Sequence, residues 1–268
     1  MPELPEVESV RKTLEKAIVG KEISKVKVFY PKIIDGDVEE FKSNLKGQRI
    51  VDVQRVAKFL VFILEDYAFI SHLRMEGKYH YLKKEKSLGK HDHLALQFKE
   101  GDSLCYNDVR KFGRLQLVDK SDFLQTPPLS NLGPEPWQAE IDDIYYKMQR
   151  SSLPIKAILL NQHIIAGIGN IYANEICFEM RLNPKTPGNK LTREQVGKLI
   201  DVSGKILEHS IREGGTTIHS FANDGETGNY QNYLKVHMKF ECLVCGGNIA
   251  KEKIKGRGTY YCKNCQSA

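Results

Sequence analysis

Long hydrophobic runs are missing from this sequence. The longest uninterrupted apolar stretch is Phe59–Leu64, with six residues, whereas a membrane-spanning helix needs about 20. The first residues also lack a basic segment followed by an apolar one, which is the pattern of a secretory signal peptide. Internal repeats and low-complexity tracts are absent as well. These absences exclude a membrane-spanning chain and lead us to expect a cytoplasmic protein with no membrane partner.

The sequence contains both basic and acidic residues, and the basic residues are slightly more numerous. Lys and Arg number 40 against 34 Asp and Glu, which gives a formal net charge of +6. Such a small excess is only weak support for a nucleic-acid partner, but its distribution is more informative. Residues 239–268 hold six Lys or Arg and only two acidic residues. A basic tail of this kind suits contact with a phosphate backbone.

Cysteines are few, and four of the six follow a pattern. They form two Cys-x-x-Cys pairs separated by 16 residues, namely Cys242 with Cys245 and Cys262 with Cys265. Without an export signal, disulfides are a poor explanation, whereas this spacing is typical of a structural zinc ribbon with four thiolate ligands. The other two cysteines, Cys105 and Cys177, are isolated in the sequence, and we expect both to be small buried side chains.

The order of local patterns predicts an α+β protein with several domains. Apolar residues recur at helical spacing between residues 5 and 19, with Pro5 in the first turn and Gly20 after the last, which indicates a leading helix. Short alternating or continuous apolar stretches follow as far as Val118, and these are typical of strands. We therefore expect an N-terminal antiparallel β-sandwich with a leading helix.

A proline-rich linker separates this part from a helical one. Residues 126–137 hold four of the ten prolines, and such a cluster marks a connection. Beyond it the apolar period predicts helices at residues 138–150, 154–162, 170–180 and 192–213. The predicted organisation is a sandwich domain at 1–125, a linker at 126–137, a helical domain at 138–232 and a zinc ribbon at 233–268.

The N-terminus offers an unusual nucleophile. Pro2 is small enough for Met1 to be trimmed, which leaves an amine with a pKa near 8 rather than the value of about 10.4 of a lysine. The uncharged fraction of such an amine can attack an aldehyde-like carbon and form an iminium, and Glu3 beside it can transfer protons. Taken alone, a terminal Pro-Glu is more often frayed and idle, so this alternative stays open.

Two other segments have the character of phosphate contacts. Asn170 follows two glycines and is the expected N-cap of a helix, where free backbone N–H groups bind anions. Arg257 lies between glycines on a predicted turn and can fork onto a phosphate. A plain helical hairpin and a surface arginine remain the ordinary alternatives.

A third group of residues suits a protein that extrudes a base from DNA. Such an enzyme leaves a hole in the duplex, and apolar wedges and a planar arginine can fill it. Met75 and Phe112 are apolar residues near predicted turns, and Arg110 lies beside Phe112. Without further context, core packing is the commoner explanation for both apolar residues, and Lys58 and His91 are surface residues by default.

Five motifs occur together in order: Pro-Glu-Leu-Pro-Glu-Val-Glu at 2–8, His-Leu-Arg-Met-Glu-Gly at 72–77, Asp-Val-Arg-Lys-Phe-Gly at 108–113, Gly-Ile-Gly-Asn-Ile-Tyr at 167–172 and Gly-Arg-Gly-Thr-Tyr-Tyr-Cys-x-x-Cys-Gln at 256–266. In this combination the chain resembles bacterial formamidopyrimidine-DNA glycosylases over essentially its whole length. The resemblance implies a monomeric DNA-repair glycosylase and AP lyase with one zinc ion. Its substrate would be double-stranded DNA that contains 8-oxoguanine or formamidopyrimidines.

The resemblance also implies roles in catalysis. Pro2 would attack the sugar C1′ and form a Schiff base, Glu3 would be the acid/base at the deoxyribose, and Glu6 would support that site. Lys58 would contact the lesion phosphate and assist β-elimination. His91 would be a backbone contact.

The remaining implied roles concern DNA binding. Met75, Arg110 and Phe112 would fill the vacated stack, with Arg110 facing the cytosine. Asn170, in a helix–two-turns–helix motif, and Arg257, in the zinc ribbon, would clamp phosphates, and Arg257 would also assist δ-elimination. The loop around residues 216–229 would cover the extruded base.

The chain departs from the family pattern at two places. Ala57 stands where the family usually has glycine before the lysine, and residues 236–242 form a shorter approach to the first cysteine. Two other functions stay open: a sister glycosylase for oxidised pyrimidines, and a non-catalytic zinc-ribbon protein that binds damaged DNA. Residues 4–6 and the set of Met75, Arg110 and Phe112 favour the purine enzyme.

Overall fold

The computed structural model describes residues 1–84, 87–216 and 228–266. By their contacts, residues 1–130 form one compact unit, and residues 131–216 and 229–266 form a second. None of the helices in these described ranges is long and apolar enough to cross a membrane. Most of the loop that the sequence predicts to cover an extruded base, residues 217–227, lies outside the described residues.

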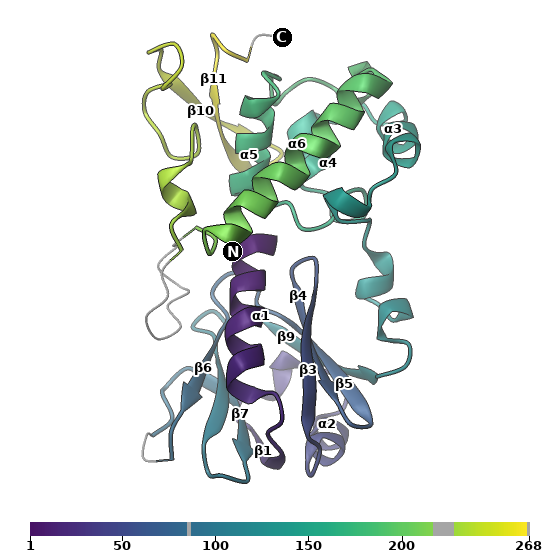
Figure 1. Ribbon diagram of the computed structural model, residues 1–268, viewed down its shortest axis with the longest axis vertical. Helices are drawn as coiled ribbons and strands as arrows, with labels where there is room; N and C mark the ends of the chain where they lie inside the picture. Colours follow the sequence, from purple (N-terminus) through teal and green to yellow (C-terminus); the bar gives the residue numbers. More distant parts are fainter. Residues whose placement is uncertain (85–86, 217–227, 267–268) are drawn as a thin grey trace. The chain divides into compact units, whose positions relative to one another are not determined.

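The first unit is built on two β-sheets (Figure 1). One is antiparallel, in the order β1 (Ile23–Val28), β7 (Asp92–Phe98), β8 (Ser103–Asn107), β6 (Lys78–Leu82). The other has the order β2 (Ile34–Asp35), β9 (Arg114–Asp119), β5 (Tyr67–His72), β4 (Phe59–Leu64), β3 (Ile50–Val56), and only β2 pairs parallel. Its helices are α1 (Leu4–Ile18), α2 (Val38–Leu45) and the 3₁₀ turns η1 (Pro31–Ile33) and η2 (Phe123–Gln125).

Both sheets and both α-helices of this unit share one hydrophobic core. Phe62 of β4 stacks on Phe69 of β5 with ring centroids 4.3 Å apart, and Phe41 of α2 meets Phe69 edge-on at 5.7 Å. Helix α1 packs on β3 and β4 through the apolar stripe that its sequence predicts. The predicted sandwich with a leading helix is therefore confirmed, and α2 is an addition that we did not predict.

Strand register gathers three connections at one edge of this unit. Phe59 pairs with His72, and His72 pairs with Arg114, so the β3–β4 turn and the segments after β5 and before β9 end side by side. In the other sheet, Lys78 pairs with Asn107. The end of the segment after β5 therefore lies beside the beginning of the segment before β9. Each of the three connections carries a candidate site residue.

The second unit is helical, with a β-hairpin (Figure 1). Its α-helices are α3 (Ile141–Gln149), α4 (Ile155–Leu159), α5 (Asn170–Glu179) and α6 (Arg193–Arg212), and its strands are β10 (Ile249–Ile254) and β11 (Arg257–Cys262). The 3₁₀ turns are η3 (Leu129–Asn131, at the junction of the units), η4 (Pro136–Gln138), η5 (Gly188–Lys190) and η6 (Tyr230–Asn232). Helix α5 packs on α4, α6 and β11. The predicted helical domain with a C-terminal ribbon is confirmed, although the first two helices are shorter than expected.

Candidate active site and zinc centre

The beginning of α1 holds two buried carboxylates. Glu3 is the N-cap of the helix and forms a reciprocal capping box with Glu6, in which the Glu3 backbone N–H donates to Glu6 Oε2 at 2.9 Å. Glu3 is 2% exposed, Glu6 is 3% exposed, and Pro2 is buried. Buried carboxylates need compensating donors, and the helix N-terminus supplies them. The terminus is thus ordered, which rules out the frayed alternative.

The amino terminus lies among ionisable groups from three parts of the chain. The amino group here is that of Met1, and burial holds its pKa below the usual value. Lys58 acts in the same direction, whereas Glu3, Glu6 and Glu76 oppose it. A lowered pKa enlarges the neutral, nucleophilic fraction of an amine. Glu76 lies inside one of the five motifs, but we had not singled it out.

The β3–β4 turn presents Lys58, which is only 5% exposed. Arg55 ties this turn to α1, because its Nε donates to Glu8 Oε2 at 2.9 Å and its Nη1 donates to the Ala57 carbonyl at 3.1 Å. Ala57 has φ 52°, in the left-handed region where a non-glycine residue costs about 1–2 kcal/mol. This backbone explains why the family usually has glycine there.

The β8–β9 connection is organised by Asp108, which is fully buried. Its carboxylate accepts the backbone N–H groups of Arg110 (3.0 Å), Phe112 (2.9 Å) and Gly113 (2.8 Å), and its own N–H donates to the carbonyl of His91. The Arg110 guanidinium lies 4.7 Å from the centre of the Phe112 ring, and both side chains are exposed. The predicted wedge residues Arg110 and Phe112 therefore lie on a loop whose backbone is held by hydrogen bonds to Asp108.

Tyr106 couples this loop to the one that carries Met75. A Cβ atom added at Gly113 would lie 1.6 Å from Tyr106 Oη, and one added at Gly77 would lie 2.2 Å from it. Tyr106 is fully buried and packs edge-on against Tyr79, so it has no room to withdraw. Tyr106 therefore leaves no space for a side chain at the glycine of either motif, and at Gly77 the Leu73 carbonyl, at 2.5 Å, excludes one as well.

His72 supports the Met75 loop as a neutral acceptor. Its Nδ1 accepts the backbone N–H of Arg74 at 2.9 Å, and its ring meets Phe59 edge-on at 4.5 Å. Burial, together with the charges of Arg74 and Lys58, lowers the pKa of His72 to about 3. The ring is therefore uncharged at neutral pH.

This lowered pKa predicts a pH-dependent stability. The unfolded chain binds a proton at His72 below about pH 6.5, whereas the folded chain stays neutral down to about 3. The stabilisation is present above pH 6.5 and is lost as the pH falls toward 3, by roughly 5 kcal/mol in all. His72→Asn keeps an acceptor for the Arg74 N–H but cannot titrate. Urea unfolding between pH 7 and 4 should show a steeper loss for the wild type, and equal slopes would refute this account.

Asn170 is the first residue of α5, and its predicted role as the N-cap is wrong. Gly169 is the N-cap, with an extended backbone, and the turn before it passes through Gly167 at φ 95°, whose N–H donates to Gln162 Oε1. Asn170 Oδ1 is buried with no hydrogen-bond partner among the described residues. A turn of the Asn170 side-chain amide by 180° exchanges Oδ1 for Nδ2, which can donate a hydrogen bond to a phosphate. A helix N-terminus whose first side-chain amide can turn its NH₂ group outward suits an anionic ligand.

Arg257 begins β11 at the tip of the ribbon hairpin and is exposed. The two-residue turn before it has Lys255 at φ 47° and Gly256 at φ 77°, the conformation that hairpin turns favour. Lys156 of α4 is fully buried, and its Nζ donates to the Gly258 carbonyl and to Thr259 Oγ1, both at 2.8 Å. This lysine, which sequence patterns did not reveal, holds the strand that presents Arg257.

The four paired cysteines converge as predicted. Their sulfur atoms all lie within 4.8 Å of one another, with Cys242 and Cys265 at 3.8 Å and Cys245 and Cys262 at 3.5 Å. Zn–S bonds of about 2.3 Å at tetrahedral angles require S···S distances of about 3.8 Å. The cysteines are thus positioned to bind one structural zinc ion, which would tie the two ends of the ribbon together.

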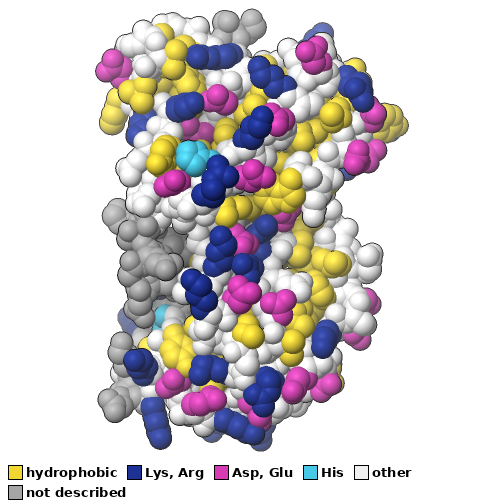
Figure 2. All heavy atoms as spheres, in the orientation of Figure 1, with side chains coloured by type: hydrophobic (Ala, Val, Ile, Leu, Met, Phe, Trp, Pro, Cys, Tyr) yellow, Lys and Arg dark blue, Asp and Glu magenta, His cyan; other side chains and the backbone are white. Residues whose placement is uncertain are grey.

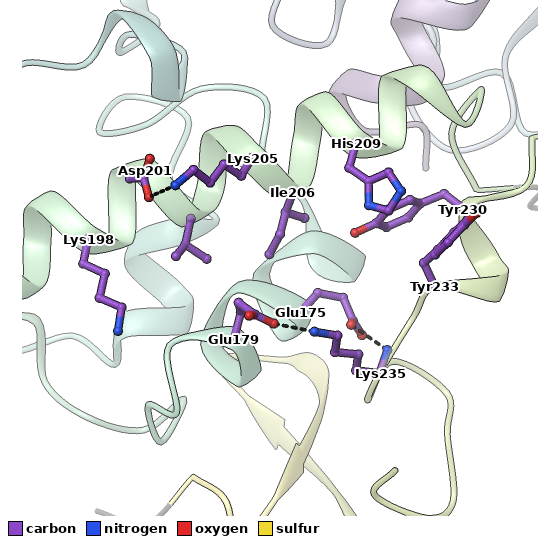
Figure 3. Close-up of a pocket in the computed structure, with 11 residues that line it drawn as sticks. Glu175, Glu179, Lys198, Asp201, Lys205, Ile206, His209, Tyr230, Tyr233 and Lys235 are labelled. Carbon is purple, nitrogen blue, oxygen red and sulfur yellow. Dashed lines mark hydrogen bonds and ion pairs between the residues drawn. The ribbon is translucent and has the colours of Figure 1, made fainter. Parts of the chain in front are cut away.

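Glu175 of α5 anchors the short approach to the ribbon (Figure 3). Its carboxylate accepts the backbone N–H groups of Lys235 (2.7 Å), Val236 (3.1 Å) and His237 (2.7 Å). The His237 ring also contacts Asn174 Nδ2 at 2.7 Å and packs edge-on against Tyr260 of β11. The shortened segment is therefore docked on α5 by buried polar contacts.

Glu175→Gln is expected to loosen this docking. The amide keeps one acceptor but turns an NH₂ group toward a backbone N–H, which costs about 2 kcal/mol for a bond to a charged acceptor. The ribbon should then open about 30-fold more often and release zinc to a chelator correspondingly faster. Glu179→Gln is the matched control, because it removes only the exposed ion pair with Lys235 Nζ. Similar release rates in both variants would contradict the prediction.

The surface charge is mixed on the face that Figure 2 shows. Lys and Arg side chains (dark blue) are interspersed there with Asp and Glu (magenta). This arrangement agrees with the small net charge of +6. The distribution of charge therefore does not mark a DNA-binding surface on this face.

Comparisons with known proteins agree with these features. Three family models match in order: the formamidopyrimidine-DNA glycosylase N-terminal domain at residues 1–115, the formamidopyrimidine-DNA glycosylase H2TH domain at 132–222, and the zinc finger found in FPG and IleRS at 240–268. The formamidopyrimidine-DNA glycosylases of Lactobacillus delbrueckii subsp. bulgaricus and Bacillus anthracis are 47% and 40% identical, each over 99% of both chains. Lactococcus lactis Fpg, solved with abasic-site DNA, has a TM-score of 0.94 at 38% identity and 100% coverage of both chains. The chain therefore belongs to the formamidopyrimidine-DNA glycosylase family.

Proposed function

We propose that this chain removes oxidised purines, such as 8-oxoguanine and formamidopyrimidines, from double-stranded DNA and then nicks the strand by β,δ-elimination. The observation that carries the proposal is the buried start of α1, where Pro2 directly precedes the buried carboxylates of Glu3 and Glu6, and where the charge of Lys58 acts on the adjoining amino group of Met1. Lactococcus lactis Fpg has been solved in complex with DNA that contains Fapy-dG and with DNA that contains an abasic site, which supports the same substrate class here.

The catalytic step begins once Met1 has been removed. The neutral Pro2 amine attacks the sugar C1′ while the glycosidic bond breaks, and the base leaves with a proton. The amine then loses its proton, and the C1′–O4′ bond breaks while Glu3 gives a proton to O4′, so that the nitrogen becomes an iminium. Glu6 holds Glu3 through the capping box. The resulting iminium acidifies the neighbouring C2′ proton, whose loss expels the 3′ phosphate. The Lys58 ammonium binds the lesion phosphate and assists this elimination.

Other residues hold the distorted duplex. Met75 and Phe112 fill the vacated space in the stack, and Arg110 donates to the orphaned cytosine. Their support by Asp108 and Tyr106 favours this role, because a wedge has to resist the duplex. His91, next to the Asp108 loop, is assigned a contact to the DNA backbone.

Phosphate contacts are assigned to the second unit. Asn170, the first residue of α5, and exposed Arg257 would clamp the backbone, and Arg257 would also assist δ-elimination. A monomer acting on the DNA of the cytoplasmic nucleoid suffices for this chemistry. We retain the division of the chain proposed from sequence: a catalytic domain at 1–125, a linker at 126–137, a DNA-binding domain with a lesion-capping loop at 138–232 and a zinc ribbon at 233–268.

The deciding experiment traps the covalent intermediate. The Met-trimmed protein is incubated with a duplex that carries one 8-oxoguanine opposite cytosine, and borohydride is added to reduce the iminium. We expect an adduct that maps to Pro2. Trapping only on an oxidised-pyrimidine duplex would favour the sister enzyme. Binding without an adduct or cleavage on either duplex would favour a non-catalytic damage-binding protein.

A further inference from the structure

Cys105 is buried as the sequence predicts, but it is not isolated in the fold. His80 of β6, Asp92 of β7 and Cys105 of β8 come from three neighbouring strands, and their ligand atoms all lie within 4.8 Å of one another. His80 and Cys105 are register partners, which explains why the two side chains meet. This cluster is separate from the four paired cysteines and takes no part in the chemistry proposed above.

We propose that His80, Asp92 and Cys105 form a second metal site, which takes a zinc-type divalent ion. One nitrogen, one oxygen and one sulfur donor suit an ion of borderline softness, whereas Mg²⁺ and Ca²⁺ prefer oxygen ligands alone. Three protein ligands leave a fourth position for water. A divalent ion would also balance the charges of the carboxylate and of a thiolate at two fully buried positions.

The carboxylate is already held in the orientation that a ligand needs. Asp92 Oδ2 accepts the Gly89 backbone N–H at 2.7 Å, and Oδ1 accepts Asn107 Nδ2 at 2.8 Å. Such outer contacts are typical of metal-binding carboxylates. His80 Nε2 lies 3.3 Å from Asp92 Oδ1, a separation that one ion bound to both would produce.

The proposed site is open to solvent on the side of His80, and it lies next to the loop that Asp108 organises. The His80 side chain is 29% exposed, whereas that of Asp92 is fully buried, so an ion can enter past the imidazole. Asp92 directly follows His91, whose carbonyl accepts the Asp108 N–H. An ion there would join three strands beneath the loop that carries Arg110 and Phe112.

Metal stoichiometry tests the proposal independently of the glycosylase activity. The protein with its ribbon zinc in place is dialysed against increasing free Zn²⁺, and zinc per chain is measured by mass spectrometry. We expect a rise from about one ion to about two in the wild type, with an increase in melting temperature. His80→Gln and Cys105→Ala should stop at about one and lose the thermal shift.

A matched control and a spectroscopic probe complete the test. Cys177→Ala alters the other isolated buried cysteine and should keep both ions. With Co²⁺ in place of the second ion, a thiolate-to-cobalt charge-transfer band should appear and be lost in Cys105→Ala. One zinc ion per chain at saturating concentration, or a second ion that survives in both variants, would overturn the proposal.

Discussion

A protein that retains Met1 is expected to bind a duplex containing 8-oxoguanine but to leave it uncut. The Pro2 nitrogen is then an amide without a reactive lone pair, and the amine of Met1 lies one residue before it in the chain, up to about 3.6 Å away. Attack requires the reacting atoms to be about 3–3.5 Å apart, and an error of 1 Å can cost about 100-fold. We expect the single-turnover rate of strand cleavage to fall by more than about 10³-fold.

Two preparations from one cleavable fusion make the comparison direct. One begins at Met1 and the other at Pro2, so the remaining chain is identical. A binding titration uses a duplex whose lesion sugar has been chemically reduced, so that neither preparation can cleave it. Equal affinities would show that both preparations are folded. If the preparation with Met1 cleaved DNA at the same rate, the nucleophile would have to lie elsewhere, and the buried amine of Lys58 would be the first candidate.

Gly113→Ala is expected to destabilise the first unit by about 3 kcal/mol, the upper part of the usual range for overpacking a core. The new methyl group would lie 1.6 Å from Tyr106 Oη and 2.6 Å from its Cζ. Relief requires movement of either the buried tyrosine or the loop that carries Phe112. Lesion binding should therefore weaken together with stability. Urea unfolding and a binding titration on the same preparation measure both effects.

Gly89→Ala is the control for this substitution. A Cβ atom there would meet only Asp92, at 3.5 Å or more, which is ordinary contact. A double-mutant cycle with Tyr106→Leu isolates the clash, because leucine lacks the atoms that Gly113 approaches. The two changes should cost less together than the sum of their separate effects. Strict additivity would show that the cost at Gly113 has another origin.

Short helical signals were the hardest part of the fold to predict. Helix α2 has only eight residues, and its two buried apolar side chains, Phe41 and Leu45, are a weak periodic pattern. Its cap at Asp37, which accepts the Glu40 N–H at 2.7 Å, is a signal that a closer search could have used. At Asn170 the error was of one residue, because glycine and asparagine both occur at N-caps.

The sequence by itself determined the features that depend on short spacings. The leading helix follows from an apolar period beside Pro5, and the zinc centre follows from two Cys-x-x-Cys pairs. The capping box of Glu3 and Glu6, which we did not predict, is equally local, since the two residues lie one helical turn apart. In each case the interacting groups are neighbours in the chain, so the pattern is visible without the fold.

Only the tertiary structure decided which distant residues meet. Tyr106 lies against Gly77 and Gly113, Lys156 reaches the carbonyl of Gly258, and His80 faces Cys105. These contacts depend on strand register and on helix packing, which arise from the whole core and leave no local pattern. The sequence therefore named the residues of the proposed chemistry, whereas the structure revealed what holds them in place and which residues meet at the proposed second metal site.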